Sequence, residues 1–138
     1  MNKAMLREFM DARHNMVLST VDGEGRSESA VVGFGATNKL QLVFGTAGST
    51  RKAQNIATNK DVSVVIGWDN QGTIQYEGTA RLLGGNDVDV YAEFYFLKNE
   101  GARAYKDAPN ESYFLIEPRW LRFTDTTRHP WEISEIEF

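Results

Sequence analysis

The segment AGSTRKAQNIATN, residues 47–59, places two hydroxyl side chains and two cations at the start of a predicted helix. Ser49 or Thr50 can serve as the N-cap, because a hydroxyl there accepts a hydrogen bond from a backbone N–H two or three residues further on. Arg51 and Lys52 then fall in the first turn, where the positive end of the helix dipole disfavours cations. The segment therefore predicts a negative group close to this helix start.

Two interpretations of the basic helix start remain open from the residues alone. In the first, two solvated cations follow an ordinary capped turn. In the second, the free backbone N–H groups, the dipole and the hydroxyls form an anion site. Arg51 would add a two-pronged guanidinium to that site and Lys52 a point charge. A free anion, a nucleotide or a flavin phosphate would each suit it, and local physics does not choose among them.

The other polar residues form no pattern typical of nucleophilic, acid–base or metal chemistry. There is no cysteine, and the two histidines, His14 and His129, stand far apart in the chain. This disfavours thiol chemistry and metal centres. The sequence has neither a G-x-S-x-G elbow nor a phosphate-binding P-loop. An enzyme built on this chain is therefore expected to take its chemistry from a cofactor.

The composition is that of a packed, acidic protein. The 138 residues are 41% hydrophobic and carry a formal net charge of -4. This length predicts one domain, residues 1–138, with its own core. The acidic balance disfavours nucleic acid as a partner, because phosphate-backbone binding needs a basic surface. The apolar runs are too short to cross a bilayer and the N-terminus lacks a signal-peptide pattern, so we expect no membrane partner and a cytoplasmic location.

Hydrophobic periodicity predicts a mainly β chain with a few helices. Strand-like segments are 16–21, 27–36, 39–46, 61–68, 73–83, 112–125 and 131–138, and helix-like segments are 2–13, the stretch after Ser49, and 86–98. We interpret these as about six strands joined by short turns, which predicts an antiparallel barrel in an α+β domain. Most strand pairs have no helix between them, and this disfavours parallel winding.

Three local details follow from single residues. The pair Asp22-Gly23 predicts a hairpin turn in which it supplies the residue with positive φ. Asn86 or Asp87 predicts the start of the third helix. Pro118 predicts a bend or a sheet edge within its strand, because proline has no N–H to donate.

The order of these segments resembles the pyridoxamine 5′-phosphate oxidase-like family of FMN-binding split-barrel proteins. VLSTVDGEGR, AVVGF, LVFGTAGSTRKAQNI, DVSVVIGW and YEGTARLL follow one another over about residues 15–84. The tail, EPRWLRFTD and then RHPWEISEIEF, is similar to the short general-stress-protein branch. The resemblance implies a six-stranded antiparallel split β-barrel with a few peripheral helices. It also implies a homodimer with two FMN sites at its interface.

The resemblance further implies which residues hold the cofactor. Arg51 and Lys52 would bind the FMN phosphate, with Ser49 and Thr46 nearby as hydroxyl donors. One short segment would line the isoalloxazine ring, partly through backbone groups: Val31, Val32, Gly33 and Phe34. The bare backbone at Gly33 suits the close approach of a flat ring.

Further residues are implied at the far side of the flavin. Thr73 sits where the family often places a polar side chain that reaches the flavin from the partner subunit. Trp120 and Trp131 lie in the C-terminal region that often closes the site. Packing in the core or at the dimer interface is an equally good interpretation of each tryptophan.

Two departures from the family pattern concern its best-known substrate. Oxidases that act on pyridoxamine phosphate have an arginine near Ala30 and a lysine near Gly35, and both positions here are small and uncharged. We therefore expect FMN binding without vitamin B6 oxidase activity.

These observations predict an FMN-dependent oxidoreductase that uses a small-molecule substrate or an electron donor such as NAD(P)H. The alternative is a flavin-binding stress or sensor protein with no turnover of its own. A haem or deazaflavin binder on the same fold is a third interpretation. For haem, His14 or His129 would have to serve as the ligand.

Overall fold

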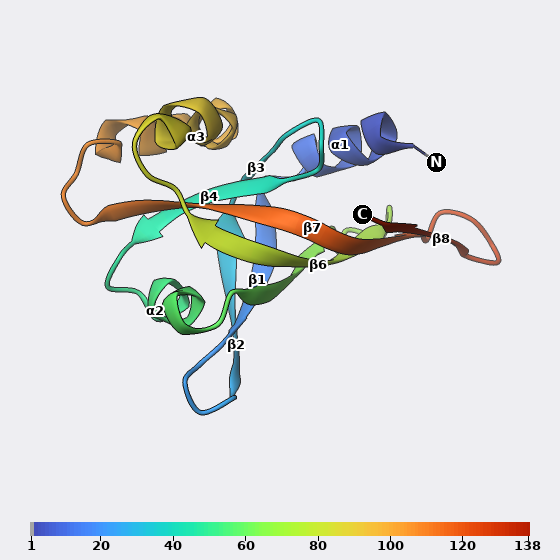
Figure 1. Cartoon of the computed structure of the whole chain (residues 1–138). Coiled ribbons are helices and arrows are strands. Elements are labelled where there is room, and N and C mark those ends of the chain that lie inside the picture. The colour runs from blue at the N-terminus through green and yellow to red at the C-terminus, as the bar shows by residue number, and fades with distance from the viewer. Residues whose placement is uncertain (1) are drawn as a thin grey trace.

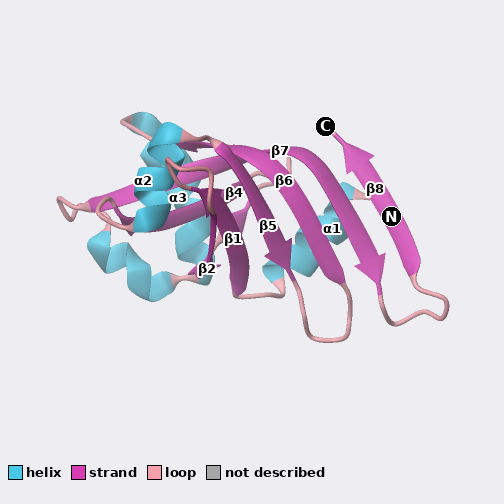
Figure 2. Ribbon diagram, turned by 90° about the horizontal axis from the view of Figure 1, so that it is seen from below, coloured by secondary structure: helices cyan, strands magenta, loops and turns pink. Residues whose placement is uncertain are grey.

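The strands of residues 2–138 form one antiparallel sheet of eight strands, seen from two directions in Figures 1 and 2. This computed structural model describes residues 2–138. The strands are β1 (Asn15–Val21), β2 (Ser27–Gly33), β3 (Gly35–Ala36), β4 (Leu42–Ala47), β5 (Asp61–Ile66), β6 (Thr73–Leu82), β7 (Glu111–Asp125) and β8 (Glu132–Glu137). Their order is β2-β1-β5-β6-β7-β4-β3, and β8 pairs with β7 outside this path. The sheet curls into an open half-barrel.

The α+β, mainly β class is confirmed, but the prediction of six strands is wrong. The segment predicted as one strand over 27–36 divides at Phe34, which is fully buried. Before Phe34 the chain pairs with β1, and after it the chain pairs with β4 at the opposite edge of the sheet. The C-terminal tail then adds β8 beside the second half of β7. The sheet is therefore longer than a six-stranded barrel and does not close on itself by strand pairing.

Strand β7 holds the two halves of the sheet together. Its first part pairs with β4, its last part pairs with β8, and β6 runs along almost its whole length. The β6–β7 register shifts between Glu77 and Gly78, opposite Pro118. A side chain at Gly78 would collide with the carbonyl oxygen of Glu117. The bend predicted at Pro118 is thus confirmed, and it is a bulge.

The hairpin between β1 and β2 differs from the prediction. The residue with positive φ is Gly25, at +83°, and not the pair Asp22-Gly23. The Asp22 carboxylate instead accepts hydrogen bonds from the backbone N–H groups of Glu24 and Arg26, at 2.9 Å each. A longer turn closed by an aspartate side chain replaces the two-residue turn, because aspartate competes well for nearby backbone N–H groups.

In the described part of the chain, three α-helices and one short 3₁₀ segment accompany the sheet: α1 (Lys3–Asp11), α2 (Arg51–Thr58), α3 (Asn86–Lys98) and η1 (Glu100–Tyr105). The predicted start of the third helix is confirmed at Asn86, and Gly85, with φ +57°, precedes it without a side-chain cap. Asp87 and Asp89 lie inside its first turn, where their charges suit the helix dipole. Within residues 2–138, none of the helices is long and apolar enough to cross a membrane.

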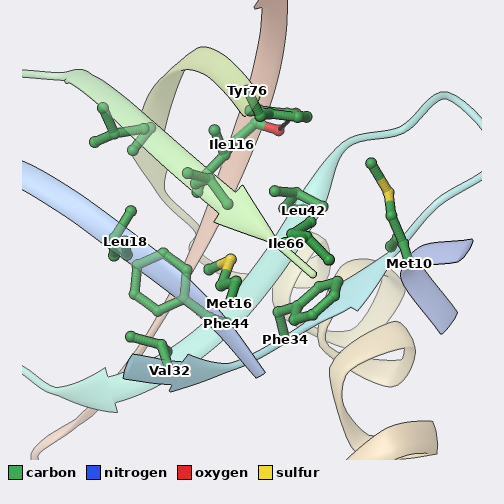
Figure 3. Close-up of a cluster of buried hydrophobic side chains, with 14 of the residues drawn as sticks. Met10, Met16, Leu18, Val32, Phe34, Leu42, Phe44, Ile66, Tyr76 and Ile116 are labelled. Atoms are coloured by element: carbon green, nitrogen blue, oxygen red, sulfur yellow. Dashed lines mark hydrogen bonds between the residues drawn. The ribbon is translucent and has the colours of Figure 1, made fainter. Parts of the chain in front are cut away.

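Two hydrophobic clusters lie on the two faces of the sheet. The larger cluster fills the inside of the curl, where alternate residues of the strands meet Met10 of α1 (Figure 3). Ile56 of α2 belongs to the same cluster. The smaller cluster packs Ala92 and Phe96 of α3 against the outer side of β4 and β7. Helices α2 and α3 therefore lie on opposite sides of these strands, as Figure 1 shows, and each is held by its own core.

Candidate functional site

The start of helix α2 is built around two threonines at the end of β4. Thr50 is the N-cap: its hydroxyl oxygen accepts from the backbone N–H of Ala53 at 3.4 Å and donates to the carbonyl oxygen of Ala47 at 2.9 Å. The hydroxyl of Thr46 lies 3.2 Å from that of Thr50. The side chain of Ser49 is not part of the cap and accepts from the Asn110 amide at 3.4 Å. Of the two predicted N-caps, Thr50 is the correct one.

The predicted basic residues line a pocket of about 490 Å³ between the start of α2 and strands β1 and β2. We call this pocket the anion seat. Its lining includes Glu28, Ala30, Ser49, Thr50, Arg51 and Lys52. Three of the residues implied for the FMN phosphate are therefore together. Thr46, the fourth, is buried and does not line the pocket. Its hydroxyl contacts that of Thr50, which does.

The negative group predicted near the helix start is Glu28. Its Oε2 atom lies 3.0 Å from Nε of Arg51. Its Oε1 atom accepts from the side-chain amide of Asn55, one turn further along α2, at 2.8 Å. Sequence reasoning missed Glu28, although it shares the inward face of β2 with Ala30 and Val32, a place where strands seldom put a carboxylate.

A second pocket of about 590 Å³ lies where the β5–β6 and β7–β8 turns meet. We call it the aromatic pocket, because Trp68, His129 and Trp131 line it together with Thr73. The indole side chains are largely exposed: Trp68 is 58% and Trp131 60% accessible to solvent. The predicted pair Thr73 and Trp131 is thus brought together, whereas Trp68 and His129 were not expected there. Trp68 and His129 lie far apart in the sequence and come together only because the β5–β6 and β7–β8 turns are adjacent in the folded protein.

The anion seat and the aromatic pocket share no lining residue. An apolar stripe crosses the outer face of the sheet from β2 through β1 to β5. In the strand register, Val31 of β2 is opposite Val17 of β1, which is opposite Val65 of β5. Val31 is 65% exposed, and Val65 also lines the aromatic pocket. One chain alone does not bring Thr73 and Trp131 to Arg51.

The segment implied to line a flavin ring has its larger side chains elsewhere. Val32 and Phe34 are buried in the core inside the curl, as Figure 3 shows. The amide side chain of Asn99 covers Gly33, so that a Cβ on this glycine would stand 2.5 Å from Asn99 Oδ1. Val31 is the member of this segment whose side chain faces solvent. Trp120 lies on β7, outside the lining of the aromatic pocket, between Glu77 and Glu137 of the neighbouring strands.

Lys98, at the end of α3, packs against Phe34. Its ammonium nitrogen lies 3.6 Å from the centre of the Phe34 ring. It donates to the carbonyl oxygens of Met10 and Arg13, at the end of α1, at 3.0 and 2.6 Å. Burial lowers the pKa of Lys98 to about 8. Lys98 therefore connects the end of α3 to the end of α1. It lines neither the anion seat nor the aromatic pocket.

Residues 2–138 contain no group of three or more histidine, cysteine, aspartate or glutamate side chains that could hold a metal ion.

The family model for pyridoxamine 5′-phosphate oxidase matches residues 3–125 of the chain. The chain belongs to the pyridoxamine 5′-phosphate oxidase family. A curated pyridoxine/pyridoxamine 5′-phosphate oxidase from Anaplasma marginale (strain St. Maries) is 32% identical over 77 residues. That match covers 55% of this chain and 35% of the relative, so it spans about a third of the relative's length.

Solved structures with low identity share the fold. A haem-binding protein from Mycobacterium smegmatis superimposes with a TM-score of 0.82 at 15% identity, over 99% of this chain and 58% of that one. General Stress Protein 26 from Bacillus anthracis (strain Sterne) gives a TM-score of 0.71 at 22% identity, over 95% of this chain and 98% of that one. Both likenesses concern the fold alone.

The structure explains one departure from the family pattern. A Cβ atom at Gly35 would collide with the backbone of Phe94 in α3, so no lysine fits at this position. Ala30, the other departure, lines the anion seat, where its small side chain leaves the pocket open. The packing of α3 therefore accounts for Gly35, whereas Ala30 is a lining residue of an open pocket.

Proposed function

We propose that this protein binds FMN, with the phosphate in the anion seat, and acts as an FMN-dependent oxidoreductase. The observation that carries the proposal is the convergence of Arg51, Lys52 and the capped first turn of α2 in one pocket of a chain of this family. A phosphate suits this place because it accepts from backbone N–H groups and from charged donors together.

The residues present fit an FMN phosphate. Lys52 makes no ion pair among the contacts of residues 2–138, so its charge is free for a ligand. Arg51 uses its Nε atom for Glu28 and has 81% of its side chain exposed, which leaves its terminal nitrogens available. Ser49 adds a hydroxyl on the same rim. In this proposal Arg51 and Lys52 hold the phosphate, and Val31 contacts the ring.

The proposal includes a homodimer. A second copy packed on the apolar stripe of Val17, Val31 and Val65 would cover apolar surface that is otherwise exposed. It would also bring the aromatic pocket of one chain toward the anion seat of the other. Thr73 and Trp131 would then complete the site across the interface, as the family resemblance implies.

The chemistry in this proposal belongs to the cofactor. Bound FMN would supply hydride transfer, and the chain's own residues would fix its position and exclude water. The electron donor would be NAD(P)H or a small reduced substrate, and the protein would work in the cytoplasm. Pyridoxamine phosphate is a poor candidate substrate, because Ala30 and Gly35 replace the expected cations.

One observation favours a second candidate, a haem binder. His129 lies in the aromatic pocket beside Trp68 and Trp131, so a nitrogen ligand and apolar ring surfaces occur in one place. A deazaflavin carrying a phosphate would use the same anion seat as FMN. A non-catalytic flavin-binding sensor differs from the enzyme only in turnover.

A titration tests the proposed site. Purified apoprotein is mixed with FMN or with riboflavin, which lacks the phosphate, and flavin fluorescence is followed. We expect FMN to bind at least about tenfold more tightly, because charge-assisted hydrogen bonds to the phosphate are worth about 1.5–3 kcal/mol each. Equal affinities would contradict a phosphate contact at the anion seat. Repeated reduction by NAD(P)H and reoxidation by an acceptor would separate the enzyme from the sensor.

A further inference from the structure

The anion seat already contains a carboxylate. Glu28 reaches it from the edge strand β2 and pairs with Arg51, at 3.0 Å between Oε2 and Nε. An incoming phosphate would need the same guanidinium. A phosphate and Glu28 are therefore competitors for Arg51.

Buried polar groups hold Glu28 in this position. The amide nitrogen of Asn55 donates to Glu28 Oε1 at 2.8 Å and to the Thr20 hydroxyl at 3.0 Å. Asn55 is 7% exposed and Thr20 2% exposed, so neither side chain has room to turn toward solvent. Because Asn55 holds the carboxylate of Glu28 independently of Arg51, the carboxylate stays beside the anion seat when Arg51 turns toward a ligand.

The charges of the anion seat show what this arrangement does. Arg51 and Lys52 contribute two positive charges and Glu28 one negative charge, so the seat carries 2 − 1 = +1. A phosphate monoester at neutral pH carries close to two negative charges. The net charge of the anion seat therefore neutralises only about half of the charge of the phosphate. The carboxylate of Glu28 also places a like charge beside it. Like-charge contacts of this kind are a common way to reject a ligand.

We propose that Glu28 determines the specificity of the anion seat by competing with phosphate for Arg51. Free phosphate, which makes no contact outside the seat, is rejected. A phosphate carried by a larger ligand binds, because contacts made by the rest of the ligand compensate for the displaced ion pair. This inference rests on the proposed function in that it takes the seat to be the phosphate site.

The test compares wild type with Glu28→Gln, which removes the charge and keeps an oxygen to accept from Asn55. The matched control is Glu24→Gln, which makes the same change of charge in the β1–β2 hairpin, outside the lining of the seat. Binding of inorganic phosphate is followed by phosphorus NMR line broadening, and binding of FMN and riboflavin by fluorescence. Thermal unfolding of each variant confirms that it is folded, and Glu28→Thr serves as a second variant suited to a strand.

For Glu28→Gln we expect the dissociation constants of inorganic phosphate and of FMN to fall by about tenfold, because removing a nearby like charge relieves repulsion. Riboflavin affinity should not change, and Glu24→Gln should behave as wild type. Unchanged or weaker phosphate and FMN binding in Glu28→Gln would overturn the inference, since Glu28 would then be neutral or would position Arg51 for the ligand.

The outcomes separate this inference from the proposed function. Tighter phosphate binding in Glu28→Gln without any flavin binding would support the role of Glu28 and contradict the FMN proposal. FMN binding that is equally tight in wild type and in Glu28→Gln would support the FMN proposal and overturn the role of Glu28. Absence of phosphate and flavin binding in every variant would contradict both.

Discussion

Arg51 is the residue on which the proposed phosphate contact depends most. It is largely exposed, it lines the anion seat, and its single ion pair with Glu28 leaves its terminal nitrogens without a partner among the described contacts. Glu28 holds its Nε atom, and Asn55 in turn holds the carboxylate of Glu28. At this scale the site is one exposed cation between a hydrogen-bonded carboxylate and an open pocket.

The first prediction concerns this side chain. Arg51→Ala removes a charge-assisted contact worth about 1.5–3 kcal/mol, so FMN affinity should fall by about one to two orders of magnitude. Fluorescence titration measures the change, and Arg26→Ala, a cation on the β1–β2 hairpin, is the control. An FMN affinity that survives Arg51→Ala unaltered would return the basic helix start to a pair of solvated cations.

Helix α2 presents these residues, and its stability depends on its cap. Thr50→Ala removes the acceptor of the Ala53 N–H and should lower the free energy of unfolding by about 1 kcal/mol. Ser49→Ala, one position earlier, lacks that contact and should have a smaller effect. Urea unfolding of both variants checks the order. Equal losses would mean that Thr50 is not the effective cap.

Lys98 connects helices α1 and α3, and we expect its contribution to the free energy of unfolding to depend on pH. Its pKa is about 8 in the folded protein, against an ordinary value of 10.5. Between these values the unfolded chain binds more protons than the folded one, so this lysine's contribution to stability rises with pH from about 8 to 10.5. The difference in unfolding free energy between wild type and Lys98→Met should therefore grow in favour of wild type across that window. A difference independent of pH would contradict the lowered pKa.

Elements with a strong local pattern could be predicted from sequence, and elements defined by distant contacts could not. The alternation of β5 and β6 follows from periodicity within each strand, and the start of α3 follows from the local signal at Asn86 and Asp87. The division of 27–36 at Phe34 depends on two different partner strands. The same holds for the site: the hydroxyls and cations after Thr46 are a local pattern, whereas Glu28, Trp68 and His129 join their pockets through tertiary folding.

At the scale of the whole molecule, the apolar stripe on the outer face predicts an assembly. Val65→Lys places a charge in that stripe and should convert a dimer into a monomer with much weaker flavin binding, because the aromatic pocket of the second copy is lost. Val90→Lys, at another exposed valine on α3, is the matched control. Sedimentation velocity separates the two states. A wild-type protein that sediments as a monomer would contradict the shared site.

The half-barrel, the anion seat and the aromatic pocket together support one central claim, that this member of the pyridoxamine 5′-phosphate oxidase family binds FMN. The absorption spectrum of the purified protein tests it most directly, followed by chromatography of what denaturation releases. We predict a yellow protein with flavin bands that releases FMN. A colourless protein that takes up no added FMN, or a protein with the Soret band of haem, would contradict the claim.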